Sequence, residues 1–420
     1  MSMIDDSESA SSPRRRPRRP LPPPPPLQDY EILRELEPHL ASVLWRALRD
    51  VRSWAEASLE ERPRLFPPAA DGVRERPAYP SVGSPMLAHA LGMLTVVRSA
   101  PRAASVGEVV RACSEISTWA EANAFTTTAT VWAEAAAVAD PENPITSIDA
   151  GKRTRNAAMY DRAEIWFSRG NTLASRQRSR REQIRALLGY GTLLREVGRV
   201  DEAKRVIAQA SRLASHTRRQ RQAAESAHDL MLVAILDGND EEVLQFATEA
   251  IQSYPVHHPA VPGLVHDWCV YILRIGLHAQ ALPLLTQIVP LATRPDLNVL
   301  FASTWGRAGA GSGSREIFEE AVRVVISMAE IHGRWASAAY GSIAEGACAL
   351  KEWDRAEAYA ARAVEIAIAS GDVESHQNAL DILDAIATRR MPIQARDSPR
   401  GTRIASISVR LAELLERRRG

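Results

Sequence analysis

Three cysteines and a pair of adjacent histidines are the most reactive residue types in this 420-residue sequence. Cys113, Cys269 and Cys348 lie far apart and lack CxxC or zinc-type spacing, which indicates buried thiols in a reducing cytosol. His257 and His258 lie among prolines without further ligands at helical spacing, so a loop role is favoured over metal binding. No metal or other cofactor is therefore expected.

Sequence motifs of catalysis are also missing. The chain contains no GxxxxGK[ST], GxSxG or HExxH motif, and no dinucleotide-binding glycine fingerprint that follows a strand. Gly309, Gly311 and Gly313 form a glycine-rich run, which we interpret as a flexible turn between two helices. The protein is not expected to be an enzyme.

Two arginine-rich runs, residues 176–181 (RQRSRR) and 218–221 (RRQR), could together contact nucleic-acid phosphates. They lack the interleaved aromatic residues of single-strand binding surfaces, and solvated helix ends explain them equally well.

The whole chain balances 52 Lys and Arg against 51 Asp and Glu. No apolar run approaches the roughly 18 residues of a membrane span. Neither nucleic acid nor membrane is an expected partner, and a cytoplasmic location is expected.

A repeat of helical hairpins provides the elements that position the remaining polar residues. In the clearest copy, residues 187–214, Leu187, Gly191 and Leu194 share one helix face, Gly198 marks a turn, and Ala203 begins a second helix. Ala203 serves as the anchor of the repeat. By subtraction, its equivalents recur at intervals of 34 to 40 residues, at Ala129, Ala163, Val243, Ala281, Phe318 and Ala356.

This order of small and large residues resembles the tetratricopeptide repeat (TPR) family. The resemblance implies an all-α fold, a right-handed α-solenoid of helix-turn-helix hairpins, over residues 86–388. A helix near residues 373–387 is expected to cap its open end. Most intervals exceed the family's period of about 34 residues, and the family's bulky tryptophan is missing from the copies. The sequence is therefore similar to the degenerate TPR arrays of bacterial regulators.

The resemblance also implies a binding site, because the first helix of each TPR hairpin lines the inner surface. The family's inward-facing positions correspond here to Lys152, Arg155, Asn156, Arg185, Arg195, His228, His266, Arg274 and Arg307. Guanidinium groups bind carboxylates bidentately, and an asparagine can hold a peptide backbone. The implied ligand of this basic surface is an acidic peptide or a C-terminal carboxylate. Scattered solvated charges remain the alternative interpretation.

The segments outside the repeats define the remaining boundaries. Residues 1–27 form an arginine- and proline-rich tail that is predicted to be disordered, and its proline run could bind an aromatic groove or act as a spacer. Residues 28–61 are predicted helical with a break near Pro38, and residues 62–85 form a proline-rich connector. Residues 389–401 form a linker before an amphipathic helix at 402–420. That helix could dock on its own solenoid, on a second copy of the chain, or on a partner.

Together these features predict a protein-interaction adaptor, or scaffold, that binds a segment of another protein in its inner groove. The alternative is a regulatory TPR protein, in transcription or signalling, whose array senses a peptide or partner. A transcription regulator would need a DNA-binding module, and residues 29–61 show no helix-turn-helix pattern with a glycine turn.

Overall fold

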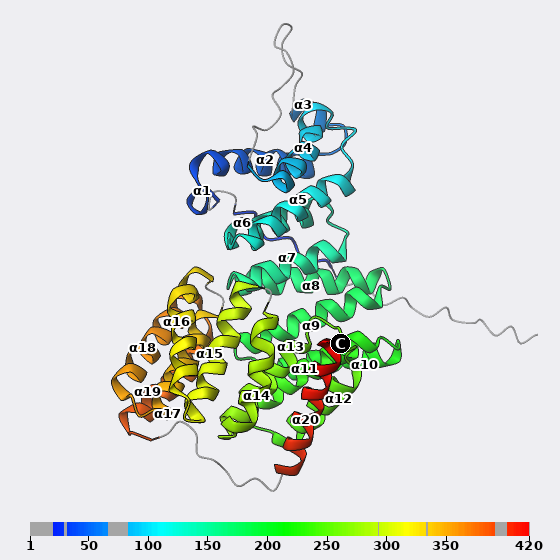
Figure 1. Cartoon of the computed structure of the whole chain (residues 1–420). Coiled ribbons are helices and arrows are strands. Elements are labelled where there is room, and N and C mark those ends of the chain that lie inside the picture. Colours follow the sequence, from blue (N-terminus) through cyan, green and yellow to red (C-terminus); the bar gives the residue numbers. More distant parts are fainter. Residues whose placement is uncertain are drawn as a thin grey trace, which may run out of the picture.

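The computed structural model describes residues 20–28, 32–65, 83–292, 294–332, 335–390 and 401–419. These ranges contain twenty α-helices, one short 3-10 helix (η1, Val289–Leu291) and no strand. Fourteen of the helices form consecutive hairpins: α5 (Val106–Ala122) with α6 (Thr126–Ala139), α7 (Pro144–Asn156) with α8 (Tyr160–Arg176), α9 (Arg180–Glu196) with α10 (Val200–His216), α11 (Gln220–Leu236) with α12 (Asp240–Ser253), α13 (Val261–Arg274) with α14 (His278–Ile288), α15 (Pro295–Gly311) with α16 (Arg315–His332), and α17 (Ala336–Ala349) with α18 (Trp353–Ser370). The predicted all-α solenoid is confirmed (Figure 1).

Buried anchor residues set the packing within the hairpins, and five of the seven are alanine. The anchors are all buried in the second helix of their hairpin: Ala129, Ala163, Ala203, Val243, Ala281, Phe318 and Ala356. A Cβ atom on Gly191 would lie only 2.4 Å from Cγ1 of Ile207, so glycine is what allows α9 to approach α10 this closely. Each pair can therefore bury its apolar faces with little empty space.

The turns between paired helices use a left-handed residue. Gly198, Gly238 and Gly276, which the repeat pattern places at turns, have φ angles of 77°, 67° and 82°. At the third of the seven turns, the amide of Arg199 donates to the carbonyl of Leu194 at 2.8 Å, and this bond closes the end of α9. Non-glycine residues occupy the same position at other turns, which is a reason why the repeat is hard to recognise locally.

The glycine-rich run before the anchor Phe318 is not simply a flexible turn. Gly309 and Gly311 lie inside α15, and only Gly313, with φ 85°, lies in the turn. A Cβ atom on Gly311 would lie 2.2 Å from Nδ1 of His278. The glycines therefore permit close contact between neighbouring helices, and that part of the turn interpretation was wrong.

The N-terminal helices extend the array. They are α1 (Ile32–Glu35), α2 (Pro38–Glu56), α3 (Arg62–Leu65) and α4 (Pro85–Ser99). The predicted break is present, because Pro38 begins α2 at a position where its missing N–H is not needed. Buried side chains of α2 and α4, including Trp54, share one hydrophobic core with α5 and α6. Residues 66–82 of the predicted connector lie outside the described residues.

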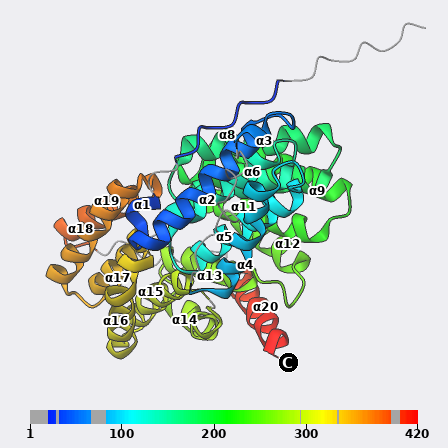
Figure 2. The same ribbon diagram turned by 90° about the horizontal axis from the view of Figure 1, so that it is seen from above.

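The predicted disordered tail needs a correction. Residues 1–19 lie outside the described residues, but residues 20–28 run in an extended conformation along the solenoid (Figure 2). Leu27 is buried in the same core as α2, and the carbonyl of Pro26 accepts a hydrogen bond from Arg162 Nη2 at 2.9 Å. Composition indicated disorder, but these contacts order the segment.

The two C-terminal helices have different roles. Helix α19 (Val373–Ala387) caps the hairpins at the predicted place, while α20 (Gly401–Arg419) packs against α12, α13 and α14. The apolar stripe of α20 is buried within its own chain: Ile404, Ile407, Leu411, Leu414 and Leu415. Of the three predicted docking modes, the structure has docking on its own solenoid, which leaves this stripe unavailable for self-association. Residues 391–400 of the predicted linker lie outside the described residues.

The array bends back on itself. Figure 2 shows α18 and α19 on one side, α9 and α12 on the other, and α13 to α15 between them. Across this bend, Arg195 Nη1 of α9 lies 2.8 Å from Glu374 Oε2 of α19. The capping helix thereby reaches the third hairpin. Within the described ranges, every helix is too short or too polar to span a membrane.

Candidate functional site

The bend surrounds a cavity of about 1410 Å³ that is open to solvent on one side. Its walls are the first helices of six successive hairpins, from α7 to α17, and it is closed by the end of α18 and by α19. This agrees with the expectation that first helices face the inner surface. The walls combine apolar side chains, such as Leu232, Val270 and Phe301, with many charged ones.

Seven of the nine predicted site residues line this cavity: Arg155, Asn156, Arg195, His228, His266, Arg274 and Arg307. Lys152 and Arg185 do not belong to the lining. Lys152 lies about one turn before Arg155, and Arg185 lies nearly three turns before Arg195, on helices that contribute only their C-terminal ends. Arg185 instead contacts Asp149 at 3.1 Å.

The lining is not mainly basic, so that part of the prediction was wrong. Five arginines face eight carboxylates, which gives a formal charge of −3 with neutral histidines. The arginines are Arg155, Arg195, Arg274, Arg307 and Arg390, and the carboxylates belong to Glu196, Asp229, Asp267, Glu345, Asp372, Glu374, Asp381 and Asp384. The last four of these acids come from α19 and the residue before it, and the family offsets for first helices do not include that element.

A carboxylate bridges the two predicted histidines. Asp267 Oδ2 lies 2.9 Å from Nε2 of His228, and Asp267 Oδ1 lies 2.9 Å from Nδ1 of His266. The other ring nitrogen of His266 lies 3.0 Å from Thr304 Oγ1. Burial alone would raise the pKa of Asp267, but the two histidine hydrogen bonds outweigh it and hold this pKa well below its usual range. The histidines are thus fixed in orientation and partly satisfied within the wall.

Asp229 lies next to His228 and lines the same cavity. Within the described part of the chain it takes part in no hydrogen bond or ion pair of its side chain. Burial raises its pKa to about 6, although His228, Arg195 and Arg155 oppose the shift. Asp229 is half-buried, and a half-buried carboxylate without a direct partner is a candidate to receive a cationic group of a ligand. The family offsets missed it, although it directly follows a predicted residue.

Arg307 is the most informative cation of the cavity. Its side chain is 6% exposed, and its Nη1 atom lies 2.5 Å from Oε2 of Glu345. Its Nε and Nη2 atoms have no hydrogen-bond partner among the described residues. Burial lowers the pKa of Arg307 and raises that of Glu345, with each group opposing the shift of the other. The N–H groups of Nε and Nη2 point in parallel, a geometry that matches a carboxylate, and both nitrogens are buried from solvent behind the cavity surface.

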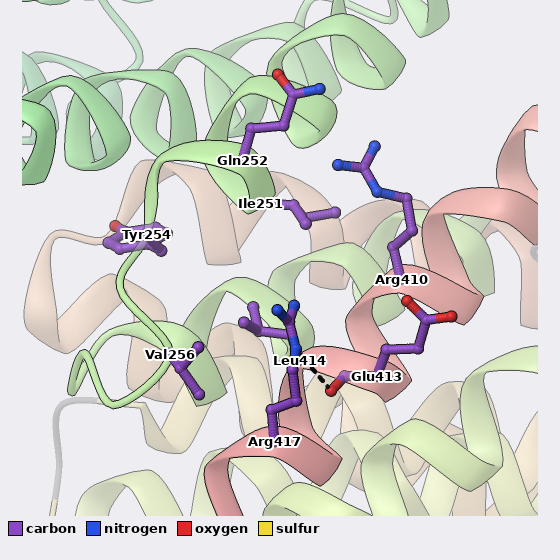
Figure 3. A pocket seen from close by; sticks show the side chains of 8 residues that line it. All are labelled: Ile251, Gln252, Tyr254, Val256, Arg410, Glu413, Leu414 and Arg417. Atoms are coloured by element: carbon purple, nitrogen blue, oxygen red, sulfur yellow. Dashed lines mark hydrogen bonds between the residues drawn. The ribbon is translucent and has the colours of Figure 1, made fainter.

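A smaller cavity of about 270 Å³ lies along the junction between α12 and the docked α20 (Figure 3). Arg410, Glu413 and Arg417 of α20 line one side, and Arg417 Nε donates to the carbonyl of Glu413 at 3.4 Å. On the other side Tyr254, which is buried, lies with its hydroxyl 3.4 Å from Nδ1 of His228. We interpret it as packing space beneath the docked helix. The described residues contain no group of three His, Cys, Asp or Glu side chains that could hold a metal ion.

Comparison with known proteins finds solved structures of similar fold. No family model matches the chain, and no curated protein matches it. The structure of the Rap conjugation gene regulator of the plasmid pLS20 in complex with the Phr* peptide is similar, with a TM-score of 0.50 and 15% identity over 82% of this chain and 96% of that chain. A crystal structure of Rap protein complexed with Competence and Sporulation Factor gives a TM-score of 0.45 and 12% identity over 86% of this chain and 100% of that chain. The first likeness shows a shared fold, an all-helical repeat array.

Proposed function

We propose that this protein is a TPR-type, peptide-binding adaptor whose cavity holds a carboxylate-bearing segment of a partner protein. The observation that carries the proposal is that Arg307 lines the cavity while its Nε and Nη2 donors are buried without an acceptor, so a ligand carboxylate can accept from both once this side chain turns towards the cavity. Buried donors without acceptors cost about 1–3 kcal/mol each. A ligand carboxylate that accepts from both Nε and Nη2 would recover this energy on binding.

The dimensions of the cavity suit a peptide. Its volume of about 1410 Å³ exceeds the roughly 300–1,000 Å³ of pockets for drug-sized molecules. Asp229 on α11 and Arg307 on α15 lie two hairpins apart. Neighbouring helices pack about 8–10 Å apart, so the axes of α11 and α15 are separated by no more than roughly 16–20 Å along the bent array. Extended chain covers about 3.3 Å per residue, so five or six residues are enough to connect them.

The charges of the lining restrict the ligand further. Eight carboxylates would repel a peptide that is acidic along its whole length, so the ligand needs its negative charge at one end, near Arg307. Asp229 favours a positive group at the other end, against the opposing charges of Arg195 and Arg155 nearby. A short peptide with a C-terminal carboxylate and a cationic residue satisfies both conditions.

A regulatory role is the second candidate, in which peptide binding changes how the protein engages another macromolecule. The similar structure of a conjugation gene regulator was determined with a peptide bound, and this favours the regulatory reading. The two roles differ in a measurable way. An adaptor captures a partner that itself contains the bound segment, whereas a regulator gains or loses its partner when a separate peptide is added.

The proposal requires no catalysis, cofactor, membrane or nucleic acid. The histidines and acids of the cavity wall serve in it as a binding surface, with Asp267 holding both rings in place. We place the protein in the cytoplasm, where its three free, buried cysteines would stay reduced.

A hexapeptide library with free C-terminal carboxylates tests the proposal, alongside the same library with amidated ends. Full-length protein should retain a subset of the free peptides and lose about tenfold or more in affinity for their amidated forms, since a charged hydrogen bond contributes about 1.5–3 kcal/mol. Capture of no peptide, or equal capture from both libraries, would contradict the carboxylate-binding site.

A further inference from the structure

The proline run Pro22–Pro26 lies on a second surface of the solenoid, away from the cavity lining. Arg169 Nη1 donates to the carbonyl of Pro22, and Arg162 Nη2 donates to the carbonyl of Pro26 at 2.9 Å. Pro25 is buried, as is Leu27, while Pro23 and Pro24 are exposed. The segment thus contacts α8 through the carbonyls of Pro22 and Pro26 and leaves part of its surface in solvent, and its extended backbone is drawn in Figure 2.

The two donors match the geometry of a polyproline II chain. Arg162, Trp166 and Arg169 are spaced i, i+4 and i+7 and so share one face of α8. The seven residue steps from Arg162 to Arg169 rise about 10 Å along an α-helix, and the four steps from Pro22 to Pro26 extend about 12 Å in a polyproline II helix. The segment runs antiparallel to α8, since its first bonded carbonyl pairs with the later arginine.

The arginines are held in place by buried partners. Arg162 donates to both carboxylate oxygens of Glu134 at 2.7 Å, and Nε1 of Trp166 donates to the same carboxylate at 2.8 Å. Glu134 is 1% exposed. Arg169 is 3% exposed, also donates to the carbonyl of Pro141 at 3.2 Å, and lies 5.8 Å from the ring centroid of Trp166. Both donors are therefore oriented before the proline segment arrives.

A polyproline II chain has no internal hydrogen bonds, so all its carbonyls can accept bonds from a receptor, and little conformational entropy is lost on binding. We propose that the face of α8 formed by Arg162, Trp166 and Arg169 is a polyproline II binding site. The chain's own residues 20–27 occupy it, and it accepts the same proline-rich sequence from a separate chain once this segment is withdrawn. The site is independent of the peptide cavity proposed above.

The test uses a fluorescein-labelled peptide of residues 20–28, PLPPPPPLQ, and fluorescence anisotropy. A full-length variant with P22G, P23G, P24G, P25G and P26G withdraws the resident ligand without shortening the chain. It should bind the peptide, whereas wild-type protein should bind at least about tenfold more weakly, because its own segment competes at a high effective concentration. A peptide with serine in place of the five prolines should not bind.

Side-chain substitutions in the glycine variant identify the surface. Adding Arg169→Met should weaken peptide binding about tenfold, the loss of one charge-assisted hydrogen bond. Arg205→Met, at an exposed position of α10, is the matched control and should leave binding unchanged. Absence of binding to the folded glycine variant, or equal effects of the two substitutions, would overturn the proposal.

A second measurement does not depend on folding of the glycine variant. Leu21→p-benzoylphenylalanine in the otherwise wild-type chain places a photo-cross-linker beside Pro22. Irradiation should give adducts within α8 (Tyr160–Arg176) or the adjoining end of α6. Adducts elsewhere, or only between molecules, would show that the segment does not occupy this face.

Discussion

Two side chains in the cavity wall have polar groups without hydrogen-bond partners among the described residues. Arg307 keeps two donors without acceptors, and Asp229 keeps a carboxylate without a partner. Arg307 is buried and Asp229 is half-buried, and both weaken the ligand-free protein, because withdrawing unpaired polar groups from water costs free energy. Such groups are typical of binding sites, where a ligand provides the missing partner.

Replacing Asp229 by asparagine should therefore stabilise the empty protein. Its pKa of about 6 in the folded state lies above the value of about 3.9 in an unfolded chain. The folded protein thus binds the proton first, and its free energy of unfolding rises as the pH falls from about 6 to about 4. At pH 7.5 the Asp229→Asn variant should gain roughly 1–3 kcal/mol, and the gain should fade towards pH 4. Urea titrations across this range measure it.

Asp381→Asn is the matched control, because Asp381 lines the same cavity but is exposed and accepts a hydrogen bond from Gln377. It should bring no comparable gain at pH 7.5. A gain for Asp229→Asn that is absent at pH 7.5, or that grows on acidification, would show that Asp229 is not a strained carboxylate.

The repeat pattern predicted some of the polar residues of the cavity wall and missed others. His228, His266 and Arg307 follow from their distance to a repeat anchor, which fixes their direction on the helix. Asp229 and Asp267 each follow a predicted residue and were missed, since one step rotates a side chain by about 100°. The cavity surface includes adjacent residues of the same helix, such as His228 and Asp229. How many neighbouring positions of a helix reach the cavity depends on the tertiary structure, so the repeat pattern alone does not predict it.

Helices in this array are positioned by single glycines at their crossings. The ring of Phe167 on α8 fits between Gly151 on α7 and Gly189 on α9. A Cβ atom on Gly189 would lie 2.3 Å from Cε1 of Phe167, and one on Gly151 would lie 2.9 Å from Cδ1. The ring is enclosed on both sides and cannot move away from an added methyl group.

Gly189→Ala should therefore destabilise the array by about 1–3 kcal/mol, the usual cost of overpacking a core. Gly92→Ala is the matched control, because Gly92 lies inside α4 with nothing within 4 Å of the added Cβ. This control should stabilise the protein by about 0.5–1 kcal/mol through helix propensity. Melting temperatures of the two variants should shift in opposite directions. A shift in the same direction would contradict the packing described for Phe167.

The ends of helices were predictable from the sequence where a proline or a glycine marks them. Pro38 begins α2, the glycine turns lie after the first helices, and α19 spans the predicted capping residues. The order of residues 20–28 was not predictable, because a proline run has the same composition whether or not a surface holds it. The donors that hold it, Arg162 and Arg169, lie more than a hundred residues away.

At the scale of the whole molecule, the bend of the array creates the cavity. The curvature of a solenoid accumulates from a small rotation at each repeat, so no single sequence feature predicts that α19 reaches α9. The contact between Arg195 and Glu374 closes the bend at 2.8 Å. Glu374 is 37% exposed, and such partly exposed pairs contribute about 1 kcal/mol or less.

Reversal of charge at this contact should open the array. Glu374→Lys places a second cation beside Arg195, and the repulsion should favour separation of α19 from α9 by on the order of 1 kcal/mol. Small-angle X-ray scattering should then give a larger radius of gyration than for wild-type protein. Glu365→Lys, at an exposed position of α18, is the control and should leave the radius unchanged. Unchanged scattering from both variants would show that the bend does not depend on this contact.

The central claim is that Arg307 receives the carboxylate of a bound peptide, and the most direct measurement is calorimetric titration of a captured free-carboxylate hexapeptide. Arg307→Lys keeps the charge but removes the two-donor face, so affinity should fall roughly 10- to 100-fold. Arg185→Lys makes the same exchange outside the cavity and should bind as wild-type protein does. Equal affinity of all three proteins would contradict the account, and a loss confined to Arg185→Lys would place the ligand outside the cavity.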